Sequence, residues 1–158
     1  EGRVIVDLAI GRADISPLDP TNRGELELLY SSWIRSYYKA GGIYRTRPEA
    51  AYDADQRETI NQILSKDATF ILVARDDEFP DTVKGWLCAE DRRDGRVIHF
   101  AYTRSMFRRH GVFSALFRAQ PKFDGPLLYS HWTFYATKKF GKRPGLAKKL
   151  GAVYINPT

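Results

Sequence analysis

The residues best suited to chemistry lie in one basic stretch, TRSMFRRHGVFSALF, at residues 103–117. An apolar, strand-like run ends there, and Gly111 stands directly before residues with helical spacing. Backbone N–H groups in the first helical turn lack internal partners, and the helix dipole is positive there, so such a junction binds phosphate. Gly111 lets a bulky anion approach the main chain closely. Positive charge and donors come from Arg104, Arg108, Arg109 and His110. The stretch therefore predicts an anion site.

Hydrophobic periodicity predicts the helices that surround this stretch. Apolar residues from Leu26 to Tyr37 recur at three- and four-residue steps, which predicts a helix over residues 21–40, capped by Thr21 or Asn22. Asp55 and Glu58 have capping-box spacing and predict a helix over residues 55–65. Two more helices are expected over residues 111–119 and 146–150.

Runs of strand-forming residues predict the sheet. Residues 16–20 are expected to form a turn, and the connections between residues 69 and 102 are short enough for an antiparallel meander. The expected strands cover residues 4–10, 69–74, 82–90, 96–102, 126–130 and 153–155. The order of these elements predicts one mixed α/β domain over residues 1–158.

Composition narrows the classes of function. No apolar run reaches the roughly 18 residues of a membrane helix, no secretory leader is visible, and no metal site is expected. Cys88 is the single cysteine and is expected in the core, which favours a reducing cytoplasm. The net charge of +6 is uneven, because residues 104–158 hold 11 Lys and Arg against one Asp. That basic third attracts polyanions, or is a solvated surface.

The segment Arg108-Arg109-His110-Gly111-Val112-Phe113 resembles the pyrophosphate loop of the GNAT acyl-CoA-dependent acyltransferases, Arg/Gln-x-x-Gly-x-Gly/Ala. The meander upstream and the closing helix, glycine and strand at residues 146–154 are similar to that family as well. The resemblance implies an α+β fold with a mostly antiparallel sheet, splayed between the fourth and fifth strands and flanked by about four helices. It also implies acetyl transfer from acetyl-CoA to an amine acceptor.

The resemblance implies cofactor-binding roles for two short segments. The edge at Ala101, Tyr102 and Thr103 would pair with the pantetheine arm, and the stretch from Arg108 through Arg109, His110, Gly111, Val112 and Phe113 to Ser114 would hold the pyrophosphate. The chain departs from the family at two places. Phe113 stands where the family has Gly or Ala. Ala147 stands where the family often has, in its last helix, a Tyr that acts as the general acid.

Transfer to an amine requires a base for the amine and a proton for the thiolate. His99 is the first candidate base because its ordinary pKa, about 6.5, suits neutral pH; Glu90 is the second. Tyr129 and Tyr135 are the candidate acids. The alternative for His99 is a histidine that only bonds its neighbours. The alternative for the whole chain is a non-catalytic GNAT-like module that binds nucleic acid or a protein through its basic third, including residues 138–143.

Overall fold

The structure, a computed structural model, describes residues 2–40, 48–129 and 152–154. Within these residues the chain forms strands, three α-helices and one 3₁₀ turn. The strands are β1 Val4–Asp7, β2 Arg12–Pro17, β3 Thr69–Asp76, β4 Val83–Arg92, β5 Gly95–Thr103, β6 Leu127–Tyr129 and β7 Ala152–Tyr154. The helices are α1 Arg23–Ala40, α2 Glu49–Leu64, η2 Ser105–Phe107 and α3 Val112–Arg118.

The described strands form one sheet in the order β1-β2-β3-β4-β5-β6-β7. The pairs from β1 to β5 are antiparallel, whereas β5–β6 and β6–β7 are parallel. β6 pairs with β5 only along Arg96–Ile98, at the start of β5. The described part of β6 does not continue along Ala101–Thr103, where the two strands were expected to diverge. The predicted α+β fold with a mostly antiparallel sheet is confirmed.

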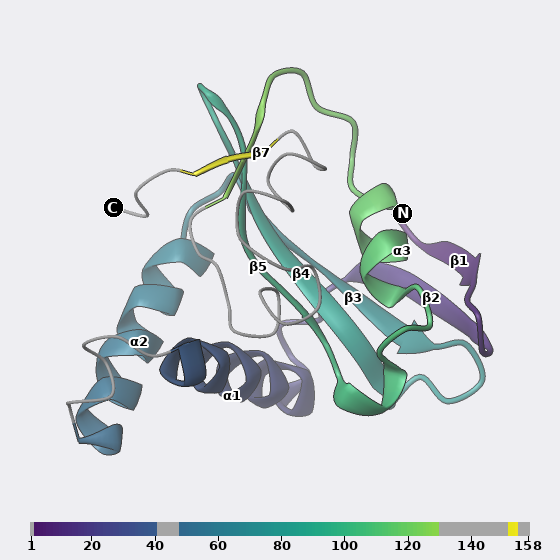
Figure 1. Cartoon of the computed structure of the whole chain (residues 1–158), viewed down its shortest axis with the longest axis horizontal. Helices are drawn as coiled ribbons and strands as arrows, with labels where there is room; N and C mark the ends of the chain where they lie inside the picture. Colours follow the sequence, from purple (N-terminus) through teal and green to yellow (C-terminus); the bar gives the residue numbers. More distant parts are fainter. Residues whose placement is uncertain (1, 41–47, 130–151, 155–158) are drawn as a thin grey trace.

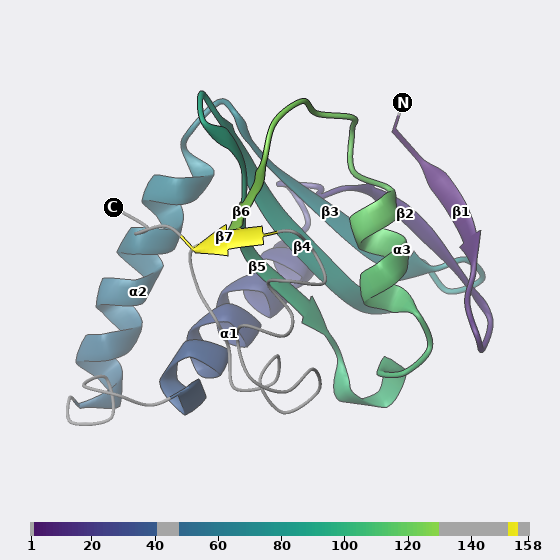
Figure 2. The same cartoon turned by 45° about the horizontal axis from the view of Figure 1, so that its top comes forward.

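Helices cover both faces of the sheet. α1 and α2 lie on one side and α3 lies on the other (Figures 1 and 2). Beneath α1 and α2 the core is aromatic: the Trp33 ring lies 5.5 Å from the rings of both Trp86 and Phe100. Beneath α3 the core is built from small residues and leucines, among them Ala13, Ala74, Leu87, Ala89 and Leu116. The small side chains let α3 lie close to the sheet.

Gly85 is required where α3 crosses β4. A Cβ atom on Gly85 would collide with the carbonyl oxygen of Tyr102 and lie 3.1 Å from Val112. Cys88, three residues after Gly85 in β4, is fully buried in the aromatic core beneath α1 and α2, as expected. Burial raises the pKa of the Cys88 thiol far above its usual range, so this cysteine is inert.

The N-terminal strand was predicted wrongly. The single strand expected over residues 4–10 is a hairpin: β1 ends at Asp7, and β2 occupies residues that include part of the expected turn at 16–20. Gly11, with φ of 73°, reverses the chain between the two strands. Ala13 and Ile15 alternate with polar residues and are fully buried. This short alternation is a strand signal that Pro17 and Pro20 obscured.

The second helix begins six residues earlier than predicted. α2 starts at Glu49, after Pro48 at the N-cap, so Asp55 and Glu58 lie inside the helix and form no capping box. The residues before Asp55 favour a helix, and Tyr52 anchors them because it is 1% exposed and packs on Tyr38.

The first helix agrees with the prediction. The side chain of Asn22 accepts a hydrogen bond of 3.1 Å from the Glu25 amide, as an N-cap residue does. The helix expected at residues 146–150 lies outside the described residues. No described helix has the length and apolar character needed to cross a membrane.

Candidate functional site

His99 lies at a β-bulge in β5. Cys88 pairs with Phe100 and Ala89 pairs with Ile98, so His99 is an extra residue between the two pairs. A bulge turns side chains out of strict alternation and strengthens the local twist. Glu90 pairs with Val97, two residues before His99, so the two side chains lie on one face of the sheet, and His99 Nε2 lies 2.8 Å from Glu90 Oε1. The two candidate bases of the sequence are therefore partners.

Glu90 is held from three sides. Besides His99, it pairs with Arg92 at 3.1 Å and with Lys66, two residues beyond the last residue of α2, at 3.4 Å. Glu90 is 6% exposed and His99 is 1% exposed. The sequence did not point to Lys66 or Arg92; the only signal was that Arg92 follows Glu90 by two residues and so shares its face of the strand.

This arrangement fixes the protonation of the pair. Burial lowers the pKa of His99 below its ordinary value, and the hydrogen bond to the Glu90 carboxylate opposes this only in part. Burial alone would raise the pKa of Glu90, but hydrogen bonds from Arg92 and His99 hold it below its ordinary value. At neutral pH, Glu90 is therefore ionised and His99 is neutral, with its Nε2–H donating to the carboxylate.

The loop between β5 and α3 has two residues in the left-handed region. Arg109 has φ of 68° and Gly111 has φ of 90°. Gly111 is the N-cap of α3, and no described side chain caps this helix. A Cβ atom built on Gly111 would meet nothing within 4 Å among the described residues. Open space thus adjoins the backbone at the start of α3, which fits a bulky phosphate group.

Two of the basic residues of the loop brace it instead of facing outward. Arg108 Nε donates a 3.0 Å hydrogen bond to the Thr103 carbonyl, and its guanidinium lies 6.0 Å from the Tyr102 ring. The His110 carbonyl accepts a 2.9 Å hydrogen bond from the Ala9 amide in the β1–β2 turn. The His110 ring lies edge-on to Phe107. These contacts tie the loop both to β5 and to the N-terminal hairpin.

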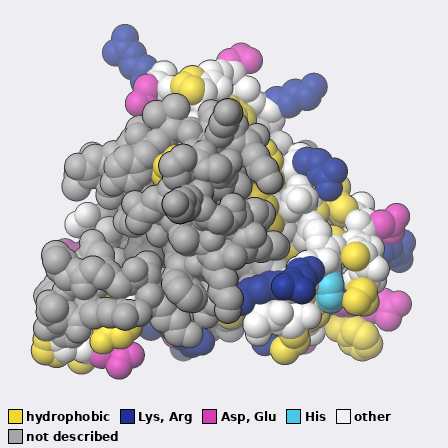
Figure 3. All heavy atoms as spheres, in the orientation of Figure 1, with side chains coloured by type: hydrophobic (Ala, Val, Ile, Leu, Met, Phe, Trp, Pro, Cys, Tyr) yellow, Lys and Arg dark blue, Asp and Glu magenta, His cyan; other side chains and the backbone are white. Residues whose placement is uncertain are grey.

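Arg109 is exposed, and Arg104 is braced by a 3.3 Å hydrogen bond to the Val83 carbonyl. On the face drawn in Figure 3, dark blue basic side chains lie beside a cyan histidine. The exposed Arg109 gives the described part of the loop a positive charge at its surface. The basic run at residues 138–143 lies outside the described residues.

No atom of the Phe113 side chain lies within 4 Å of a Cβ atom built on Gly111. The Phe113 ring packs against Phe117, one turn along α3, with 6.0 Å between the ring centroids. The aromatic ring that replaces the family's Gly or Ala is therefore accommodated along the helix. Val112 is buried against the sheet, and Ser114 is exposed at the first turn.

The remaining predicted site residues fall into two groups. Ala101, Tyr102 and Thr103 are half-buried on the part of β5 that the described part of β6 leaves unpaired. Tyr129 pairs with Ile98, one residue from His99, so a candidate acid and a candidate base lie on neighbouring strands. Tyr135 lies outside the described residues.

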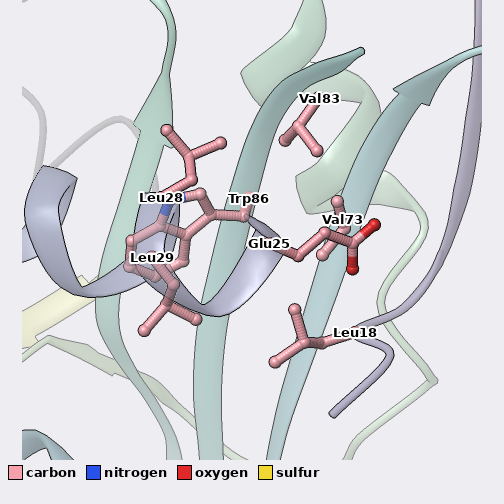
Figure 4. A pocket seen from close by; sticks show the side chains of 7 residues that line it. All are labelled: Leu18, Glu25, Leu28, Leu29, Val73, Val83 and Trp86. Carbon is pink, nitrogen blue, oxygen red and sulfur yellow. The ribbon is translucent and has the colours of Figure 1, made fainter. Parts of the chain in front are cut away.

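One pocket lies away from this site, between the start of α1 and strands β3 and β4 (Figure 4). Its walls are Leu18, Glu25, Leu28, Leu29, Val73, Val83 and Trp86. The carboxylate of Glu25 is paired with Arg75 at 2.5 Å, and the space is too narrow for a water molecule. This pocket is a packing gap. Within residues 2–40, 48–129 and 152–154, no cluster of His, Cys, Asp and Glu has the geometry to hold a metal ion.

No protein-family model matches the chain, and no curated protein matches it. Solved structures do. The chain is similar to a Pyrococcus furiosus protein assigned as an acetyl transferase, with 16% identity and a TM-score of 0.53 over 90% of this chain and 80% of that one. It is also similar to an aminoglycoside 6′-N-acetyltransferase from Acinetobacter baumannii, with 15% identity and a TM-score of 0.48 over 88% of this chain and 89% of that one.

A third match is a ribosomal-protein-alanine N-acetyltransferase from Brucella melitensis, with 18% identity and a TM-score of 0.46 over 91% of this chain and 79% of that one. Identities this low speak to the fold and not to the substrate, and the match to the Pyrococcus protein carries the comparison. Together with the predicted order of elements from β3 to α3, this match shows that the chain has the GNAT fold.

Proposed function

We propose that the chain transfers an acyl group, acetyl in the first instance, from acyl-CoA to an amine. One observation carries the proposal: the loop after β5 turns through two left-handed residues and leads into a helix start with no described side-chain cap, beside open space. Main-chain donors and the positive end of α3 would hold the pyrophosphate there. The fit is supported by Phe113, whose ring packs on Phe117 and has no atom within 4 Å of a Cβ atom built on Gly111.

The pantetheine arm would extend along β5 from the loop. The edge at Ala101–Thr103 is not paired with the described part of β6, so its main chain suits pairing with an extended amide-containing arm. The Thr103 carbonyl already accepts from Arg108, which directs the pairing to the residues before it. The thioester would then lie toward the bulge at His99.

In the proposed reaction the nitrogen of a neutral amine attacks the thioester carbonyl, the C–S bond breaks, and the thiolate takes a proton. His99 is the proposed proton acceptor, and Glu90 positions its ring through the Nε2–H bond. Because His99 is 1% exposed, the proton would reach it through water. Tyr129, beside His99 on β6, is the proposed proton donor to the thiolate, and Tyr135 is the second candidate.

Calorimetry with acetyl-CoA tests the site. We expect saturable binding in the micromolar to millimolar range, which Gly111→Trp abolishes by filling the open space and Arg108→Ala weakens by releasing the loop from Thr103. Gly125→Trp is the matched control, because Gly125 also has a positive φ, of 107°, but lies near Gly95 at the opposite end of β5. No heat at millimolar acetyl-CoA, or equal affinity of Gly111→Trp and Gly125→Trp, contradicts the proposal.

A further inference from the structure

The first strand is an open edge of the sheet. β1 pairs with β2 on one side and has no described strand on the other. Val4 and Ile5, whose side chains point to opposite faces, are 41% and 43% exposed. An edge of this kind is a template for a further strand, and its sequence decides which strand fits.

The register shows which main-chain groups of β1 are available. The Leu8 amide donates a 2.9 Å hydrogen bond to the Gly11 carbonyl, so Leu8 directs its main-chain groups toward β2. Because these groups alternate along an antiparallel ladder, Val6 and Val4 also face β2. The N–H and C=O groups of Arg3, Ile5 and Asp7 therefore point away from the sheet.

We propose that β1 pairs with β1 of a second copy of this chain, antiparallel and with a two-fold axis at Ile5. In that register Ile5 lies opposite Ile5, and Arg3 lies opposite Asp7 of the second copy. These are the three residues whose main-chain groups point outward, so about six hydrogen bonds form. On the other face, Val4 lies opposite Val6 of the second copy, so each face contributes apolar contact.

Charge complementarity selects this register. The Arg3 side chain is 64% exposed and contacts Asp14 on its own chain, and Asp7 is exposed with no ion pair among the described residues. A shift of two residues in either direction places Arg3 or Asp7 opposite Ile5 and loses both charge pairs. A two-fold axis at Ile5 gives two Arg3–Asp7 pairs.

The interface is small because β1 has four residues, so the dimer is weak and depends on concentration. Its position on the sheet edge makes the proposal independent of acyl transfer. Sedimentation velocity of the full chain up to millimolar concentration tests it. We expect a monomer–dimer equilibrium, weakened about tenfold or more by Arg3→Asp or by Asp7→Arg, since each sets like charges opposite each other.

The two charge variants also test each other. An equimolar mixture of Arg3→Asp and Asp7→Arg restores opposite charges at both ends of the pair, so we expect the mixture to associate although neither variant does alone. Thermal unfolding of each variant shows whether it remains folded. A chain that stays monomeric at all concentrations, or a dimer that both substitutions leave unchanged, overturns the proposal.

Cross-linking checks the register and does not depend on charge. Cα atoms of Ile5 and its counterpart would lie about 5.5 Å apart, within disulfide reach. The two Val4 residues would not lie opposite each other, because each lies opposite Val6 of the other copy, two residues along the strand. We expect Ile5→Cys to form a disulfide-linked dimer under mild oxidation and Val4→Cys to remain monomeric. Cys88 is buried and does not interfere. Equal cross-linking of both variants contradicts the register.

Discussion

The side chains of His99 and Glu90 are brought into contact by the pairing of β4 with β5. Each was a candidate base from its position in the sequence, and their contact follows from the register of the β4–β5 hairpin. Glu90 pairs with Val97, two residues before His99, so the pairing of β4 with β5 places the ring and the carboxylate on one face of the sheet, where they meet. The roles of Lys66 and Arg92 depend on the same geometry. The residue types were predictable, and the assembled centre was not.

The balance of charges around His99 predicts the effect of Glu90→Gln. The Glu90 carboxylate raises the pKa of His99, whereas Arg92 and Lys66 lower it. Removing the negative charge leaves the two cations, so the pKa of His99 should fall further below its ordinary value. NMR titration of the imidazole measures this, and the chain has only three histidines.

Asp91→Asn is the control for this experiment. Asp91 follows Glu90 but pairs with Arg96 at 2.6 Å, and it does not contact His99. Its substitution should leave the His99 titration unchanged. A His99 pKa that rises in Glu90→Gln would show that the carboxylate does not stabilise the imidazolium.

At the scale of elements, the sequence predicted best where the signal was long. β3, β4 and β5 are near-continuous apolar runs with sharp turns between them, and their bounds agree with the prediction to within two residues. β2 failed because its apolar residues are few and one is Ala13. α2 failed because a capping pattern within a helix is indistinguishable, in sequence, from one at its start.

The contact between α3 and the sheet predicts the effect of Gly85→Ala. The added methyl group would collide with the Tyr102 carbonyl, which belongs to the backbone of β5 and cannot rotate away. We expect a loss of about 1–3 kcal/mol in the free energy of unfolding, measured by urea denaturation. Gly24→Ala, at an exposed position in α1, should change it by about 0.5 kcal/mol or less. Equal stability of Gly85→Ala and the wild type would mean that α3 and β5 move apart freely.

For the whole molecule, the buried pair predicts how stability depends on pH. The pKa of His99 is lowered in the folded state, so the unfolded chain binds the proton first as the pH falls below about 6.5. The pKa of Glu90 is also lowered, so its contribution is complete above about 4.5 and is lost below that value. Stability should therefore fall in two stages on acidification.

Denaturation at a series of pH values tests this dependence. In His99→Gln the first stage, which begins as the pH falls below about 6.5, should flatten, because the group that titrates there has been removed. The second stage, which belongs to Glu90 and other carboxylates, should remain. If His99→Gln and the wild type lose stability in parallel from pH 7 to 5, His99 is not the group responsible.

The hydrogen bond from the Ala9 amide to the His110 carbonyl joins the first dozen residues to the loop before α3. A change that displaces the N-terminal hairpin, such as a bulky fusion partner or removal of its first strand, therefore also perturbs the loop before α3. A shortened version of this protein that still folds would thus be a poor stand-in for the full chain in any assay of ligand affinity.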